Sequence, residues 1–264
     1  MTAVTVDRSR TDRKLPKFGG FNLGMIALEL RRLIRNKRTV IFSVVMPPAF
    51  FLLFGTSADY KHERIGDGNV TAYVLISMAV YGAMLATTSG GAMVSIERAA
   101  GWSRQLRLTP LKPAAYVAIK LTLAMLIGLV SVVVVNVTGL FFGADLPVAQ
   151  WLACAALAWV CALVFAAFGL FMGYLLPSEN VMQILGPVLA LLSFAGGLFV
   201  PLDQFGSTFA AIAKWTPVYG VGELARYPDT HDGQLWQAVL NVVAWTLVFA
   251  AGAMWRFRRD TARV

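Results

Sequence analysis

The chain alternates between long apolar runs and short polar segments. Six runs approach the roughly 20 mostly apolar residues that an α-helix needs to cross a membrane. In chain order they are Thr39–Ser57, Val70–Val94, Ala114–Phe142, Trp151–Leu176, Val181–Val200 and Leu235–Trp255. The pattern therefore predicts an all-α integral membrane protein with six transmembrane helices.

The composition agrees with a membrane environment. Of the 264 residues 58% are hydrophobic and 14% are charged, whereas soluble domains carry about 25% charged residues. A net charge of +9 could also indicate a nucleic-acid binder. Because the cations flank apolar runs, we expect no nucleic-acid partner.

The distribution of cations predicts an orientation. Residues 1–38 contain ten Lys or Arg, and the segments 95–113 and 256–264 contain four each. The loops that would lie on the opposite side hold only Lys61, Arg64, Lys214 and Arg226. Because cytoplasmic loops carry an excess of Lys and Arg, we expect both termini of this multi-pass protein to be cytoplasmic.

An amphipathic segment precedes the first run. At helical spacing one stripe is apolar (Leu23, Ile26, Leu30, Leu33, Ile34) and another is basic (Arg31, Arg35, Arg38). This pattern favours a helix in the cytoplasmic interface, and the alternative is a charged anchor for the first span. Residues 1–20 are polar and are expected to be a disordered cytoplasmic tail, which leaves residues 21–260 as one membrane domain.

The segment Pro201–Gln234, between runs five and six, is too apolar for a free loop and too interrupted for a span. We expect it to form short external helices that dip into the outer leaflet. An ordered cap over the spans is the alternative. Glu223 and Arg226 are three residues apart and could pair across one helical turn.

Residues for catalysis are missing from the sequence. It has no P-loop, no Cys/His cluster for a metal and no GxSxG motif. We find no ionisable residue near the middle of any run, as a proton- or sodium-coupled carrier would require. The polar residues Asn136, Gln183 and Asn241 are better interpreted as interhelical hydrogen-bonding groups than as substrate contacts.

A charged break, SIERAAGWSRQLRLTPLKP, separates the second and third runs at Ser95–Pro113. Read as a helix, it places Trp102 and Leu106 on one face, and Pro110 biases Thr109 against helical geometry. We expect a short helix along the membrane surface that offers Glu97 and Arg98 to a cytoplasmic partner. An ordinary basic loop is the alternative.

The motifs ER-x-x-G and QL-x-x-TPL in this break resemble the cytoplasmic coupling segment of type-2 ABC exporter permeases. The sequence GGLFVP at the end of run five and the external P-x₅-E-x-x-R at Pro217, Glu223 and Arg226 are also similar to that family. The resemblance covers residues 20–260 and is strongest to the drug-efflux branch related to daunorubicin-resistance permeases. Ala99-Ala100 departs from it, since many relatives carry a further acidic residue there.

The resemblance implies site residues in four groups. Residues that couple to an ATPase would be Glu97, Arg98, Gly101, Trp102, Gln105, Leu106, Thr109 and Pro110. A second cytoplasmic contact would involve Ser178 and Glu179. The translocation pathway would include Asn136, Gln183, Phe194 and Phe199, and the external segment would use Pro217, Glu223 and Arg226.

The resemblance also implies the partners: two separately encoded ABC ATPase subunits that bind ATP and Mg, and a second permease copy or paralogue. This chain would bind no cofactor itself. In a bacterial plasma membrane, among lipids, it would export lipophilic or amphipathic small molecules. Export of polysaccharide or lipid-linked glycan, or a non-transporting sensor or scaffold role, is the alternative.

Overall fold

The computed structural model describes residues 23–57, 61–101 and 113–262. The expected tail at residues 1–20 lies outside these ranges. So do five of the residues expected to couple to an ATPase, namely Trp102, Gln105, Leu106, Thr109 and Pro110.

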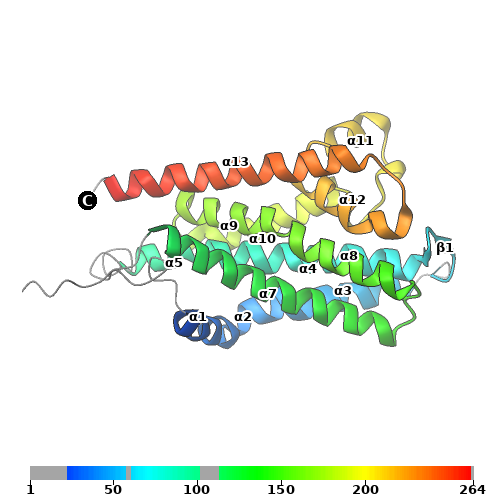
Figure 1. Ribbon diagram of the computed structural model, residues 1–264, viewed down its shortest axis with the longest axis horizontal. Coiled ribbons are helices and arrows are strands. Elements are labelled where there is room, and N and C mark those ends of the chain that lie inside the picture. The colour runs from blue at the N-terminus through cyan, green and yellow to red at the C-terminus, as the bar shows by residue number, and fades with distance from the viewer. Residues whose placement is uncertain (1–22, 58–60, 102–112, 263–264) are drawn as a thin grey trace, which may run out of the picture.

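The described chain forms an elongated helical bundle with one small β-hairpin (Figure 1). The first half contains α1 (Leu23–Arg35), α2 (Lys37–Val40), the π-helix η2 (Ile41–Val45), α3 (Met46–Gly55), β1 (Arg64–Ile65), β2 (Gly68–Asn69), α4 (Val70–Ala92), α5 (Val94–Ala99) and α7 (Pro113–Phe141). The second half contains α8 (Val148–Cys161), α9 (Leu163–Leu175), α10 (Ser178–Ala195), η3 (Leu202–Gln204), α11 (Ser207–Ala213), α12 (Pro217–Thr230) and α13 (Leu235–Ala262).

Five helical stretches in the described ranges are long and apolar enough to span a membrane, and the first predicted run supplies a shorter apolar helix, Ile41–Gly55. The prediction of a multi-pass helical membrane protein is thus confirmed. The fifth helix ends at Ala195 instead of Val200, since Gly196-Gly197 follows it and Gly197 adopts a φ of +75°, which favours glycine.

The first run is irregular because of its two adjacent prolines. The chain passes from α2 through the π-helical turn η2 into α3, which begins next to Pro47-Pro48. Proline has no N–H to give to the preceding turn. A π-helical turn is a common way to absorb such a disruption.

Small residues let three helices approach closely at the centre of the bundle. Helix α4 packs between α7 and α9. A Cβ added at Gly90 would lie 2.8 Å from the Cα of Ala124 on α7, and one at Gly169 on α9 would lie 2.1 Å from the carbonyl oxygen of Thr88 on α4. The GxxxG pair on α9, Gly169 and Gly173, therefore marks a real close contact, as such spacing suggests.

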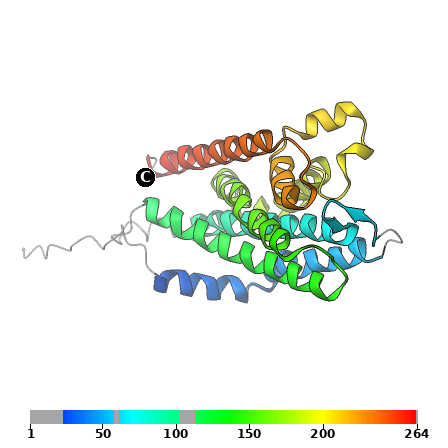
Figure 2. The ribbon, with the colours of Figure 1, turned by 45° about the vertical axis from the view of Figure 1, so that its right-hand side comes forward.

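The two ends of the bundle differ in character. Helices α1 and α5 and the carboxyl end of α13 lie at one end, and the hairpin, α11 and α12 lie at the other (Figures 1 and 2). On α1 two residues of the apolar stripe face the bundle, because Ile26 is buried and Leu30 packs beside it against α4 and α7. Arg31 and Arg35 are exposed.

Helices α11 and α12 form a helical hairpin, distinct from the β-hairpin, that turns back along α13. Asn241 donates hydrogen bonds to the carbonyls of Lys214 and Thr216, at 2.9 and 3.1 Å, and the indole of Trp245 donates to the carbonyl of Trp215 at 2.8 Å. Trp245 lies ten residues into α13, about 15 Å along its axis. The turn between α11 and α12 therefore lies beside the middle of α13 and not beside its first residue.

Candidate functional site

A buried set of charged and polar side chains joins three helices at the end of the bundle that holds α1 and α5. We call it the Glu97 cluster; its members are Glu29 and Arg32 on α1, Glu97 on α5, and Tyr116 and Lys120 on α7. Lys120 pairs with Glu97 and donates to Glu29 at 3.2 Å, and the Tyr116 hydroxyl donates to Glu97. Arg32 lies 3.9 Å from the same carboxylate.

The cluster is electrically balanced, and its central pair is shielded from water, whereas the Arg32 side chain at its edge is 55% exposed. Two carboxylates face two cations, and the side chains of Glu97 and Lys120 are each only 3% exposed. A buried ion pair gains little over an apolar pair, but removing one partner leaves an uncompensated charge and costs about 3–5 kcal/mol. The cluster therefore holds α1, α5 and α7 in one relative position.

The position of Glu97 differs from the expectation that it faces a partner. Helix α5 continues α4 after a bend at Met93, and this directs Glu97 inward onto α7. Its neighbour Arg98 reaches α9, where it donates to the carbonyls of Gly173 and Tyr174 at 3.1 and 2.9 Å. These carbonyls belong to the last turn of α9, which lacks helical donors.

Two further segments with expected site residues lie beside α5. Gly101 follows it with a φ of +72°, a conformation that directs the chain out of the helix at low cost only for glycine. Ser178 and Glu179 begin α10, which packs against α5, and Glu179 is exposed. The structure thus brings Ser178, Glu179 and the start of the charged break to the same region.

An aromatic row includes two residues expected in the pathway. Phe194 at the end of α10 lies 4.8 Å, centroid to centroid, from Phe199, which lies 4.9 Å from Tyr81 on α4. Phe50 on α3 continues the row at 6.2 Å from Tyr81. Half of the Phe194 side chain is exposed, so the row opens onto the outside of the single chain.

Two of the three polar residues in the spans form the expected hydrogen bonds to neighbouring segments. Asn136 accepts a hydrogen bond from the indole of Trp151 on α8 at 2.7 Å, and Asn241 bonds the α11–α12 turn as described. Gln183 is exposed on α10. Of the residues expected in the pathway, Phe194 and Phe199 come together, and Asn136 lies elsewhere in a helix–helix contact.

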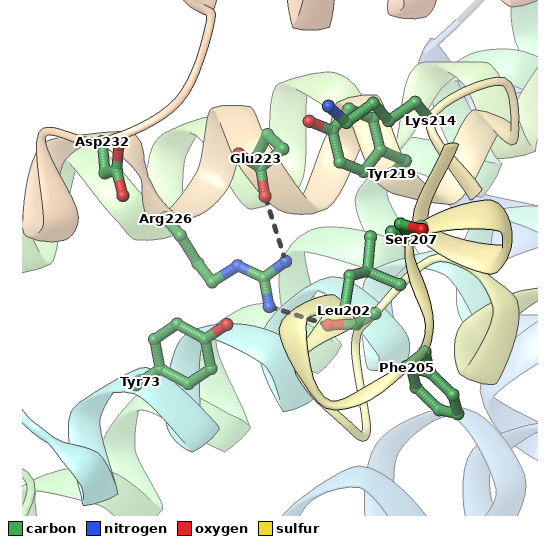
Figure 3. Close-up of a pocket in the computed structure, with 11 residues that line it drawn as sticks. Tyr73, Leu202, Phe205, Ser207, Lys214, Tyr219, Glu223, Arg226 and Asp232 are labelled. Atoms are coloured by element: carbon green, nitrogen blue, oxygen red, sulfur yellow. Dashed lines mark hydrogen bonds and ion pairs between the residues drawn. The ribbon is translucent and has the colours of Figure 1, made fainter. Parts of the chain in front are cut away.

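Of the residues expected in the external segment, Glu223 and Arg226 lie together, and Arg226 is 5% exposed. Its guanidinium donates to the Gly197 carbonyl at 3.0 Å and to Ser77 at 3.2 Å, and lies 4.9 Å from the ring centroid of Tyr73 (Figure 3). Glu223 lies 3.7 Å from it, so the predicted pairing occurs. Pro217 opens α12 after the N-cap Thr216.

A second contact at this end of the bundle is not evident from the sequence. Asp229 near the end of α12 is fully buried and accepts a hydrogen bond from the Gly68 N–H at 2.9 Å, and its backbone carbonyl accepts from Asp67 at 2.9 Å. Asp67 also contacts His231 at 3.0 Å. The β-hairpin is thereby fixed to α12, and the only sequence signal was the glycine-rich turn Gly66–Gly68.

Comparison with known proteins agrees with this arrangement. Residues 23–228 match the family described as ABC-2 type transporter. The chain is also 29% identical over 230 residues, which is 84% of this chain and 90% of its relative, to "Putative transport permease YvfS" of Bacillus subtilis (strain 168). Permeases of this family are non-catalytic, bind no cofactor and pair with ABC ATPase subunits. The chain belongs to the ABC-2 type transporter family as a multi-pass membrane permease.

Proposed function

We propose that this chain is the permease subunit of an ATP-driven exporter that moves lipophilic or amphipathic small molecules out of the cell. It works with a second copy or a paralogue and with two separately encoded ATPase subunits that bind ATP and Mg. Both termini and the break at residues 95–113 face the cytoplasm, where the ATPases dock. The excess of cations at this end supports that orientation.

The observation that carries the proposal is the Glu97 cluster. It links α5, which forms the start of the charged break, to α1 and to α7, which follows the break. A push on the break would be transmitted to these helices as a unit, because separating buried partners costs several kcal/mol. This arrangement suits a lever between an ATPase and the spans.

The aromatic row supports a lipophilic cargo. Phe50 on α3, Phe194 at the end of α10 and Phe199 just after it are at least partly exposed, and they pack beside or in line with the buried ring of Tyr81 on α4. Cargo could slide along such apolar surface without leaving a charge unpaired. The exposed Phe194 and Leu191 on α10 and Leu53 and Phe54 on α3 would be covered by the second permease, so that the pathway runs between the two copies.

The test separates folding from coupling. Glu97→Gln and Lys120→Met each upset the charge balance of the cluster by one unit, so each single variant should be less stable. The double variant Glu97→Gln/Lys120→Met leaves one carboxylate, Glu29, and one cation, Arg32, and should recover part of that stability. With the ATPase bound, the double variant should lose most cargo-stimulated ATP hydrolysis and dye efflux from vesicles.

The matched control is the exposed pair Arg64 and Asp145, 3.3 Å apart at the opposite end of the bundle. Arg64→Gln/Asp145→Asn likewise removes one cation and one carboxylate. It should leave cargo-stimulated ATP hydrolysis and efflux unchanged, because an exposed ion pair contributes little. A folded Glu97→Gln/Lys120→Met variant with full cargo-stimulated hydrolysis and efflux would show that the cluster serves stability alone.

A further inference from the structure

A pocket of about 640 Å³ opens between α11, α12 and the chain that follows α10 (Figure 3). Tyr73 of α4 and Tyr219 of α12 contribute aromatic surface to it. Arg226 lies at its base, where Ser77, Gly197 and Tyr73 hold the guanidinium in place. Because Arg226 is anchored in this way, the pocket has a preformed cationic floor.

The charges of the pocket are arranged from one side to the other. Asp232 lies toward one side and Lys214 toward the other, with the Glu223–Arg226 pair between them (Figure 3). Two carboxylates and two cations leave no formal net charge. Such a lining favours a neutral ligand with separated charges over one that is purely anionic or cationic, since like charges would repel in either case.

Helix α11 presents two different faces. Ser207, Ala210 and Lys214 line the pocket, whereas Phe209 and Ile212 lie on the other face, exposed by 40% and 65%. Trp215, at the turn into α12, is 80% exposed. An exposed tryptophan beside a cation is typical of the boundary between lipid headgroups and acyl chains.

We propose that this pocket binds the headgroup of a zwitterionic phospholipid, with the ammonium near Asp232 and Glu223 and the phosphodiester near Lys214. The acyl chains leave the pocket past Phe205, which lines it and whose ring centroid lies 4.6 Å from that of Phe209. A soluble zwitterion would share the charge pattern but gain nothing from these apolar side chains. Binding at this pocket does not depend on transport, so it can be measured on the purified chain.

The test is lipid binding by native mass spectrometry after delipidation in detergent. Phosphatidylethanolamine and phosphatidylglycerol of identical acyl chains are titrated separately, and the first should bind more tightly. Lys214→Gln should weaken phosphatidylethanolamine binding roughly ten-fold, as expected for one lost charge-assisted hydrogen bond. Asp232→Lys makes the pocket positive and should reverse the preference toward phosphatidylglycerol.

Lys214 and Asp232 are both exposed, so these variants should fold. Lys37→Gln on α2, an exposed lysine at the other end of the bundle, is the matched control and should bind like the unaltered chain. Equal binding of the two lipids, or unchanged preference in Asp232→Lys, overturns the proposal. Glycerophosphoethanolamine binding as tightly as the intact lipid would overturn the assignment to a lipid.

Discussion

The Ser131 hydroxyl of α7 donates a 2.6 Å hydrogen bond to the backbone carbonyl of Ser43 in the π-helical turn η2. In an α-helix that carbonyl would accept from residue 47, and in a π-helix from residue 48. Both positions are proline and have no N–H. Ser131 therefore supplies the donor that Pro47 and Pro48 cannot.

We expect Ser131→Ala to destabilise the protein by about 1–3 kcal/mol, since it leaves a buried carbonyl without a donor. Thr138→Val is the matched control on the same helix, because the Thr138 hydroxyl donates only within α7, to Val134. Unfolding in mixed micelles measures both variants. Equal losses of stability in the two variants would show that the hydrogen bond from Ser131 to Ser43 does not stabilise the first span.

Two glycine substitutions should change stability differently, because only one of the two glycines lies at a close contact between helices. A Cβ at Gly169 would lie 2.1 Å from the Thr88 carbonyl oxygen, whereas a Cβ at Gly186 on α10 would meet nothing within 4 Å. Gly169→Ala should cost roughly 1–3 kcal/mol or more by overpacking. Gly186→Ala should be neutral or stabilising by up to about 1 kcal/mol, because alanine favours the helix.

The buried carboxyl of Asp229 predicts a dependence of stability on pH. Burial raises its pKa above the ordinary range, against the hydrogen bond from Gly68, which lowers it, and nearby Asp67 raises it further. Between the ordinary and the raised pKa the folded state holds a proton that the unfolded state releases. The stabilisation is present below this window and is lost as pH rises through the raised pKa.

Asp229→Asn removes this titration. Relative to that variant, the unaltered protein should gain thermal stability as the pH is lowered from neutrality toward the ordinary aspartate pKa of 3.8. His231 and Asp67 face the same site and Cys154 lies beside it, so His231→Gln serves as the control for histidine titration. Parallel stability curves for Asp229→Asn and the unaltered chain would contradict the prediction.

The sequence predicts where helices lie along the chain, but not which way their side chains face once the helices have packed. Apolar length predicted the spans, and the glycine pair at the end of run five could have shown its earlier end. The contact of Lys120 with Glu97 could not be read from the chain, because it depends on how α5 turns after Met93. For the same reason the sequence does not mark Asp229, although this residue is fully buried and accepts a hydrogen bond from the β-hairpin.

The orientation can be tested by labelling single cysteines. Introduced at Ser57, Asp145 and Ser207, they should react with an impermeant reagent from outside, and one at Ser103 should react only after permeabilisation. The native Cys154 and Cys161 are buried, so their background should be low. Outside labelling at Ser103 together with protection at Ser207 would reverse the proposed topology.

The charged break yields a prediction from sequence alone, since Leu106 lies outside the described residues. Leu106→Asp should preserve insertion but abolish stimulation of the ATPase by cargo, because a large apolar anchor often carries about 2 kcal/mol or more of an interface. Arg104→Gln should matter less, since a rim charge mainly affects association rate. Co-purification and efflux assays measure both, and full activity of Leu106→Asp would make the break an ordinary loop.

The bonds from α13 to the α11–α12 turn impose an order on biosynthesis. The carbonyls of Lys214, Trp215 and Thr216 receive donors from Asn241 and Trp245, which the ribosome makes only later. Until then the turn would leave carbonyls unpaired in lipid, which costs several kcal/mol. In nascent chains that end before residue 235, the α11–α12 hairpin should therefore be cleaved by protease added from outside. In chains that include α13, the same hairpin should be protected.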